Sequence, residues 1–227
     1  MLERIAVGAF AANCWIIPLA APTAAGKVAK GEVEDCILVD PGAEAEKILS
    51  FLDARGLVPR LIVCTHGHLD HVCAIAPLQK TFEDRGRRIP IAIHREDAAY
   101  LGAGGRERNR RLFQDMGASS FFDSLWTEVP EADILLDDGA TLADTRWRVI
   151  HTPGHSKGSI CLYDEGAGLL ISGDTLFRDG VGRTDGFDGS MAEIRESIAW
   201  KLFSLPSQTQ VFPGHGEPTT IGRERGD

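Results

Sequence analysis

The sequence predicts a single α/β domain in which helices lie outside the β-sheets. Three observations predict this class. The chain has 227 residues, enough to bury a full core, and its 43% hydrophobic and 25% charged residues are ordinary for a globular protein. Short apolar runs typical of buried strands come in groups, and helical patterns follow them in both halves of the chain. No low-complexity tract or linker divides the sequence, so we expect one domain over residues 1–227.

The first half of the chain is expected to form strands and two helices. A Pro-Gly turn precedes the first helix, whose apolar residues keep helical spacing up to Gly56, a residue suited to a helix C-cap. The second helix is expected from about Val72 to Phe82, adjusted at Pro77. Residues 21–34 are small, polar and glycine-containing, which predicts a loop or long hairpin. The expected strands, rich in branched and aromatic residues, are 13–20, 36–40, 60–66 and 89–94.

The second half continues the same rhythm. Ser190 and Glu193 have the spacing of a capping box and predict a helix that ends before Pro206. The expected strands lie within residues 133–142, 147–155, 159–164, 168–174 and 209–216.

Charge and composition restrict the possible function. The chain carries 24 basic and 33 acidic residues, a net charge of −9, which disfavours a generic nucleic-acid binder. The first ten residues lack the pattern of a signal peptide, and no apolar run is long enough to span a membrane. The five cysteines are odd in number and irregularly spaced. These features predict a cytoplasmic protein with reduced thiols and no membrane partner.

Residues 64–72, CTHGHLDHV, concentrate histidine and aspartate where an apolar run ends. His66 and His68 are two residues apart, so in an extended segment both side chains point the same way and can hold one metal ion. Asp70 and His71 follow where the chain turns into a helix, and can face a second ion. The chain has only seven histidines, and three of them fall within six positions, so a chance surface loop is a poor explanation.

Three later strand ends carry the same kinds of side chain beside glycine. His155 follows an apolar run in HTPGH, Asp174 follows ISG, and His215 follows VFPG. Glycine allows a sharp turn and leaves room for an ion. Imidazole and carboxylate together suit zinc, and also iron or manganese, and the lack of thiolate argues against a closed structural zinc site. The candidate metal ligands are His66, His68, Asp70, His71, His155, Asp174 and His215.

This set of motifs resembles the metallo-β-lactamase superfamily over nearly the whole chain, from NCWII to PGHGEPTTIG. The resemblance implies a four-layer αββα sandwich with the site at one edge. It implies one ion held by His66, His68 and His155, a second held by Asp70, His71 and His215, and Asp174 as the bridge. The bridging aspartate and the stretch GDTLFRDGVGRTD are similar to the glyoxalase II branch, which implies a basic substrate-binding residue at Arg183.

The resemblance implies a thioesterase-type hydrolase, similar to hydroxyacylglutathione hydrolase, that acts on a small anionic thioester. Two divalent ions, zinc first and otherwise iron or manganese, would share a water that loses its proton near neutral pH and attacks the carbonyl. Asp70 and Asp174 are the expected catalytic carboxylates. Full glyoxalase II enzymes carry a further helical region after the last histidine motif, whereas twelve residues follow His215 here. Residues 102–130 are a candidate helical insertion or loop that covers the site instead.

The sequence leaves alternative functions and alternative residue roles open. A persulfide dioxygenase-like oxidoreductase would hold a single iron, and a phosphodiesterase or a metal-free binding protein could use the same fold. Arg183 could pair with Asp185 instead of binding substrate, and residues 106–111, RERNRR, could be a solvated face or an anion site. The remaining candidates are expected to be structural: His94, His151, Cys64 and Cys73.

Overall fold

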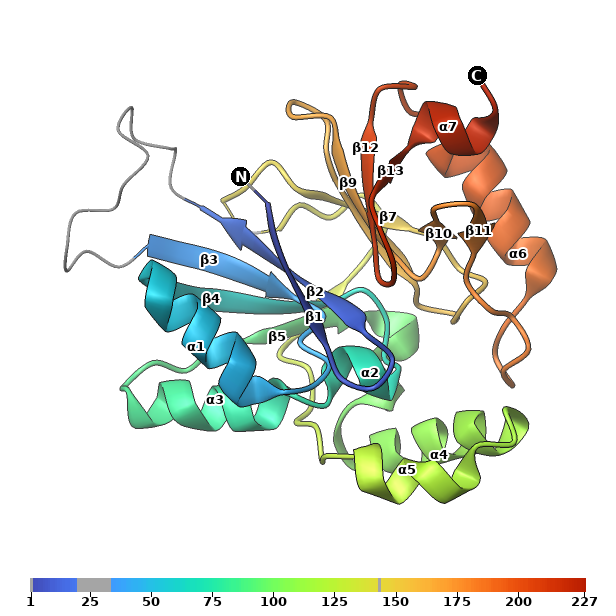
Figure 1. Cartoon of the computed structure of the whole chain (residues 1–227). Coiled ribbons are helices and arrows are strands. Elements are labelled where there is room, and N and C mark those ends of the chain that lie inside the picture. Colours follow the sequence, from blue (N-terminus) through green and yellow to red (C-terminus); the bar gives the residue numbers. More distant parts are fainter. Residues whose placement is uncertain (1, 20–33, 143) are drawn as a thin grey trace.

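The computed structural model describes residues 2–19, 34–142 and 144–227, which form two β-sheets packed face to face with helices on both outer faces (Figure 1). The expected four-layer αββα sandwich is therefore confirmed. The loop or hairpin predicted for residues 21–34 lies, up to residue 33, outside the described residues.

The first sheet has six strands in sequence order, with β1, β2 and β3 antiparallel and β3 to β6 parallel. Its strand β1 was not predicted from the sequence. The strands are β1 (Glu3–Val7), β2 (Ala12–Pro18), β3 (Glu34–Val39), β4 (Leu57–Cys64), β5 (Ile91–His94) and β6 (Ile134–Leu136).

The second sheet has the order β13-β12-β9-β8-β7, in which only the β9–β12 pair is parallel. The carboxyl ends of β9 and β12 therefore meet at the same edge of this sheet. A short ribbon of β10 and β11 stands beside it. The strands are β7 (Arg148–His151), β8 (Ile160–Asp164), β9 (Leu169–Gly173), β10 (Leu176–Phe177), β11 (Gly180–Val181), β12 (Gln210–Pro213) and β13 (Thr219–Thr220).

The central strands are apolar on both faces, and alternate residues enter different cores. In β2, Cys14 and Ile16 pack under the outer helices, whereas Trp15 and Ile17 pack between the sheets. Successive side chains of a strand point to opposite faces, so a layer covered on both sides needs apolar residues throughout. This explains the continuous apolar runs in the sequence.

The outer layers are helices that bury one face each. α1 (Ala45–Arg55) and α3 (Ile75–Asp84) cover the first sheet, and α6 (Met191–Glu196), η3 (Ser197–Leu202) and α7 (Ile221–Arg225) cover the second (Figure 1). Gly56 caps α1 with φ 66°, as predicted, in a left-handed conformation that glycine adopts without steric cost.

Two predicted helices are interrupted. The expected helix 72–82 is instead α2 (Leu69–Val72) followed by α3, and Pro77 lies in the first turn of α3, where its missing N–H is not needed. The helix after Ser190 begins as predicted, with the Ser190 hydroxyl accepting from the Glu193 N–H at 3.3 Å, but it continues through η3 as π-helix.

Residues 95–125 form helical turns: Ala98 and Leu101 pack against the core of the first sheet, whereas the later turns lie beside α2. Phe113 and Phe122 pack with Leu69 and Cys73 in a small separate core. The elements are η1 (Arg95–Tyr100), η2 (Gly102–Gly104), α4 (Gly105–Asp115) and α5 (Ser119–Leu125). The segment 102–130 is thus largely helical, and it lies beside the residues that follow β4.

Candidate metal centre

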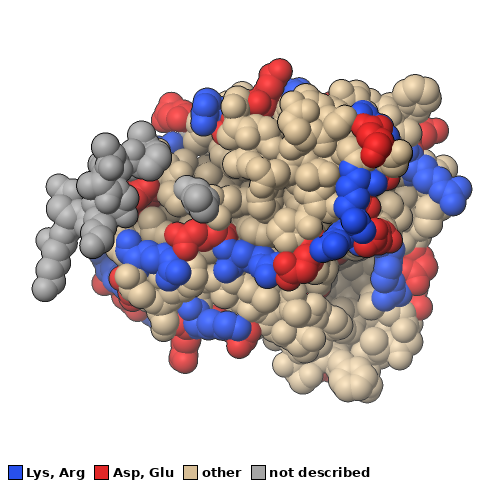
Figure 2. Space-filling view, turned by 45° about the horizontal axis from the view of Figure 1, so that its top comes forward, with Lys and Arg blue, Asp and Glu red and all other residues tan. Residues whose placement is uncertain are grey.

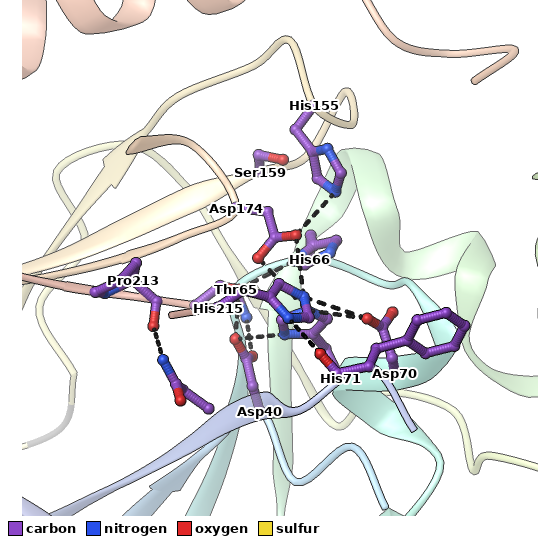
Figure 3. A network of polar contacts seen from close by, with 12 residues as sticks. Asp40, Thr65, His66, Asp70, His71, His155, Ser159, Asp174, Pro213 and His215 are labelled. Atoms are coloured by element: carbon purple, nitrogen blue, oxygen red, sulfur yellow. Dashed lines mark hydrogen bonds and ion pairs between the residues drawn. The ribbon is translucent and has the colours of Figure 1, made fainter. Parts of the chain in front are cut away.

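The candidate site lies where β4, β7, β9 and β12 end. β4 ends at Cys64, and His66 and His68 follow in the short segment before α2. Asp70 and His71 are in α2, which begins at Leu69. The structure brings all seven predicted ligands to this one edge of the sandwich. Figure 3 labels all of them except His68.

The first cluster contains His66, His68 and His155, whose candidate ligand atoms lie within 4.8 Å of one another. The ring centroids of His66 and His68 are 4.5 Å apart, as expected for alternate residues of an extended segment. The Nε2 atoms of all three rings are buried and form no hydrogen bond within the described part of the chain. Burial, with the neighbouring imidazoles, lowers the pKa of His66 and His68 well below the usual value. These rings are therefore neutral, with lone pairs free to bind a cation.

The second cluster contains Asp70, His71 and His215. The Nε2 atoms of His71 and His215 are 3.2 Å apart, and His215 Nε2 is 3.3 Å from the Asp70 carboxylate. Burial acts to lower the pKa of His71, but the nearby carboxylates, Asp174 first among them, raise it to about 10. The cluster therefore favours positive charge at the point where its ligand atoms converge.

Asp174 lies between the two clusters. Its Oδ2 atom is 3.6 Å from His155 Nε2 in the first cluster and 3.5 Å from His215 Nε2 in the second. Its Oδ1 atom is 3.5 Å from His71 Nε2, and it is buried without a hydrogen bond among the described residues. This is the position that a carboxylate shared by two ions requires.

The residues present therefore fit two divalent cations. Four buried polar atoms with no hydrogen bond, three of them imidazole nitrogens, point to a missing positive partner, since buried polar groups are otherwise paired. The donor set of imidazole and carboxylate suits zinc, iron or manganese. Gly214 keeps the space open, because an added Cβ there would lie 2.1 Å from Asp174 Oδ1.

Hydrogen bonds at Nδ1 fix the orientation of three ligand rings. His155 Nδ1 is 2.7 Å from the Arg183 carbonyl, His215 Nδ1 is 3.1 Å from the Phe10 carbonyl, and His71 Nδ1 is 3.1 Å from Asp40 Oδ2. With the proton on Nδ1, each ring presents the lone pair of Nε2 to the centre.

Asp40 is a supporting residue that the sequence reading missed. It is fully buried, and it accepts hydrogen bonds from the Thr65 N–H at 2.7 Å and from the Thr65 hydroxyl at 2.6 Å as well as contacting His71. It therefore ties the end of β3 to the start of the histidine motif. Its signal was present in CILVD, since it too follows an apolar run, but its partner lies 31 residues away.

Asp97 is a second missed residue. It is buried, and it accepts from the Gly67 N–H at 3.1 Å, the Ser156 hydroxyl at 2.7 Å and the Gly158 N–H at 2.7 Å. It joins the loop that carries His66 and His68 to the loop that carries His155. Burial raises the pKa of Asp97 to about 6.

A cavity of about 290 Å³ opens onto the metal clusters. One wall is apolar and comes from the β1–β2 turn, α4 and β10. The clusters and the loop after β11 form the rest. The residues of the apolar wall are Phe10, Leu112, Phe113, Met116 and Phe177.

Asn109 fixes the position of α4 against the metal motif. Its side chain is fully buried, its Oδ1 accepts from the Leu69 N–H at 2.8 Å, and its Nδ2 donates to the carbonyls of Gly67 at 3.2 Å and Gly105 at 3.1 Å. The apolar wall of the cavity is thus rigidly connected to the loop between His66 and Asp70.

Arg183 reaches the cavity, but its charge is already compensated. Its Nε and Nη2 donate to the two oxygens of Asp185 at 3.0 and 2.7 Å. Both side chains line the cavity and are more than half exposed. The structure thus contains the ion pair that the sequence left as one of two possibilities.

The other singled-out residues lie outside the two clusters. His94 and His151 stack on each other with ring centroids 3.9 Å apart, and His151 Nε2 contacts the Lys157 carbonyl at 2.8 Å. Cys64 and Cys73 are buried free thiols, as predicted. These four residues are structural in the described part of the chain.

The chain is similar to a known protein family and to several of its members. The family model of the metallo-beta-lactamase superfamily matches residues 28–215. The chain is 32% identical to the probable metallo-hydrolase YqgX of Bacillus subtilis, over 85% of each chain. It is 30% identical to the hydroxyacylglutathione hydrolase GloC of Haemophilus influenzae, over 99% of this chain and 94% of that one.

Two solved structures share the whole architecture. The B3 metallo-beta-lactamase BLEG-1 superposes with a TM-score of 0.81 at 30% identity, covering 100% of this chain and 97% of that one. The di-iron-bound form of TTHA1623 superposes with a TM-score of 0.75 at 32% identity, covering 98% and 96%.

Proposed function

The chain belongs to the metallo-beta-lactamase superfamily and is a metal-dependent hydrolase, and we propose that it hydrolyses small anionic thioesters at a dinuclear site. One observation carries the proposal of two ions. The two three-residue clusters share no residue, and Asp174 contacts histidines of both. Seven ligands in this arrangement are too many for one ion.

The chain's own residues bind, orient and confine the reactants. The three first-cluster histidines and the second-cluster trio would hold the ions, with Asp174 between them. Two such ions polarise a carbonyl and activate water at neutral pH. Asp70, about one-quarter exposed and lining the cavity, would hold an ion through one carboxylate oxygen and is placed to orient a water through the other.

The shape and lining of the cavity support a small thioester. Its volume suits a small molecule rather than a polymer, and its apolar wall from Phe10 to Phe177 suits an acyl or thiol carbon chain. GloC, a relative at 30% identity over nearly the full chain, is named a hydroxyacylglutathione hydrolase. No serine or cysteine nucleophile lines the cavity among the described residues, as expected where water is the nucleophile.

We propose that nucleic acid is not a substrate. Basic and acidic side chains alternate over the face drawn in Figure 2, and no continuous basic surface crosses it.

No helix in the described ranges is long and apolar enough to cross a membrane. We also propose a cytoplasmic location, which the five buried, unpaired cysteines support.

The metal is proposed to be zinc, with iron or manganese as the alternatives. The TTHA1623 structure, at 32% identity, holds two irons, so the same fold accepts them in a relative. Imidazole and carboxylate ligands do not by themselves discriminate among these metals.

The test combines metal analysis with a substrate panel. Protein reconstituted separately with zinc, iron and manganese is assayed on acyl thioesters of 3-mercaptopropanoate, the matching oxygen esters, bis(4-nitrophenyl) phosphate and a chromogenic cephalosporin. We expect about two ions per chain and preferential thioester hydrolysis. The His94→Gln variant, altered outside both clusters, should keep both ions and the same activity.

Each alternative has its own outcome. One iron per chain with oxygen uptake on a persulfide would indicate the dioxygenase instead. Preferred cleavage of the phosphodiester or of the cephalosporin would replace the thioester by that substrate. Two ions without hydrolysis of any thioester would overturn the thioester proposal while leaving the dinuclear site intact.

A further inference from the structure

Helix α4 carries four arginines within residues 106–111, and helix geometry separates them into two pairs. Residues three or four apart share a face, so Arg106 lies with Arg110 and Arg108 lies with Arg111. Arg106 and Arg110 both donate to Asp123 of α5, at 2.9 and 3.0 Å. The first pair therefore has a structural partner.

The second pair instead lies beside Phe187, in the loop after β11. The Arg111 guanidinium lies 4.3 Å from the centre of the Phe187 ring, and that of Arg108 lies 5.9 Å from the same ring. Neither forms an ion pair with a carboxylate among the described residues, including Glu107 and Asp115 of the same helix. In a chain of net charge −9 these are two uncompensated cations side by side.

Arg108 approaches the first cluster through Tyr100. The centre of the Tyr100 ring is 5.5 Å from the Arg108 guanidinium and 5.4 Å from the centre of the His68 ring. The Tyr100 hydroxyl donates to Asp188 at 2.6 Å, which fixes the ring and the adjoining Phe187. Arg108 is thus one aromatic ring away from a predicted metal ligand, and Arg111 is two rings away, since the centres of Phe187 and Tyr100 are 6.3 Å apart.

The cavity also adjoins the pair. Leu112, next to Arg111, and Gly186, next to Phe187, both line it, and they are in such close contact that a Cβ on Gly186 would lie 2.6 Å from Leu112. Asn109, next to Arg108, lines the cavity and anchors α4 to the metal motif. Both guanidiniums lie over Phe187, the residue that follows the cavity-lining Gly186, so they flank the cavity without lining it.

We propose that Arg108 and Arg111 form an anion subsite that binds a carboxylate or phosphate on the part of the substrate outside the cavity. The Phe187 ring lies close to Arg111 and within cation–π range of Arg108, which limits the freedom of both side chains before an anion arrives. A guanidinium offers paired N–H donors that match either oxyanion. Arg183, by contrast, already holds Asp185 and adds less charge.

This subsite deepens the proposed function, since it takes the ligand to be an anionic thioester, but its test does not require turnover. The probes are three thioethers without a thioester bond: 3-(benzylthio)propanoate, its neutral methyl ester, and 2-(benzylthio)ethyl phosphate, each checked to be intact by chromatography after the titration. Their binding to the metal-loaded protein is measured by calorimetry. The comparison is between Arg108→Gln/Arg111→Gln and the matched control Arg106→Gln/Arg110→Gln, which alters the same helix on its other face.

The expected result is selective. The Arg108→Gln/Arg111→Gln protein should bind the anionic probes roughly tenfold to a hundredfold more weakly than the unmodified protein, the range expected for charge-assisted contacts. Its affinity for the methyl ester, its metal content and its melting temperature should not change. The control variant should keep its preference for the anions, and added salt should reduce that preference. The stronger of the two anionic probes identifies carboxylate or phosphate as the ligand.

Several outcomes would overturn the subsite. These are equal binding of acid and methyl ester by the unmodified protein, no measurable binding of either anion, or equal losses in the two double variants. If the anion preference depends on Arg108 and Arg111 but no thioester is hydrolysed, the subsite stands and the proposed thioesterase function falls. If thioesters are hydrolysed without any such preference, the proposed thioesterase function stands and the subsite falls.

Discussion

Replacement of Asn109 by alanine tests how the cavity wall is attached to the metal motif. Three hydrogen bonds would be lost: one from the Leu69 N–H and two to the carbonyls of Gly67 and Gly105. Water cannot replace them easily, because Asn109 is fully buried and Leu69 is 3% exposed. The Leu69 N–H is also in the first turn of α2, where no carbonyl within the helix can accept it.

The size of the effect follows from these contacts. Each of the three hydrogen bonds makes a net contribution of about 1 kcal/mol, so their loss lowers the free energy of unfolding by about 3 kcal/mol. Alanine is the better helix former by about 0.7 kcal/mol, which offsets part of the loss. We therefore expect a net loss of about 2–3 kcal/mol, or a melting temperature lower by roughly 5–10 °C for a chain of this size.

The assay is denaturant unfolding of the metal-free protein, together with metal affinity by competition with a chelator. Since Asn109 orients the loop between His66 and Asp70, metal affinity should fall about tenfold to a hundredfold, as for other residues that support ligands. Gln114→Ala, at an exposed position of the same helix, is the control. Unchanged stability and unchanged metal affinity in Asn109→Ala would refute this account of how α4 is held.

Three further predictions concern the site. Asp174→Ala should lower the occupancy of both ions and reduce turnover more than His215→Ala does, because Asp174 contacts both clusters; retention of both metals in elemental analysis would show that it is not the bridge. Arg183→Ala should raise KM for an anionic thioester by about tenfold at most, with metal content unchanged. Asp185→Asn should lower KM, because it frees the Arg183 guanidinium. No change in KM in either variant would contradict this. Burial raises the pKa of Asp97 from 3.8 to about 6, so its carboxyl group stays protonated to a higher pH in the folded state than in the unfolded state. The free energy of unfolding, relative to Asp97→Asn, should therefore fall as pH rises from about 4 to 6 and be flat above, measured by urea titration of the metal-free proteins; a rise over that range would have the wrong sign.

The sequence by itself determined most of the elements and the polar residues that follow the strands of the site. Apolar runs that stop at His66, Asp174 and His215 are local signals, because a buried strand must be apolar and a polar residue beside glycine marks its end. The alternation of His66 and His68 likewise predicted their shared direction, and their rings lie 4.5 Å apart.

Some features of the elements depended on the packing around them. At the break between α2 and α3 the Ala74 N–H donates to the Pro41 carbonyl, and in η3 the Ser197 hydroxyl donates to the Pro153 carbonyl, both far away in the sequence. Propensity along the chain does not contain that information, so the sequence predicted one continuous helix in each place.

Only the tertiary structure decided the partners of the polar groups. Asp40 contacts His71 across 31 residues, and Asn109 reaches Leu69 across 40. Arg106 and Arg108 are equivalent in the sequence, yet one has a carboxylate partner and the other an aromatic ring. Hydrogen bonds and ion pairs act over a few ångströms, and which groups come that close is set by how the sheets and helices pack rather than by distance along the chain.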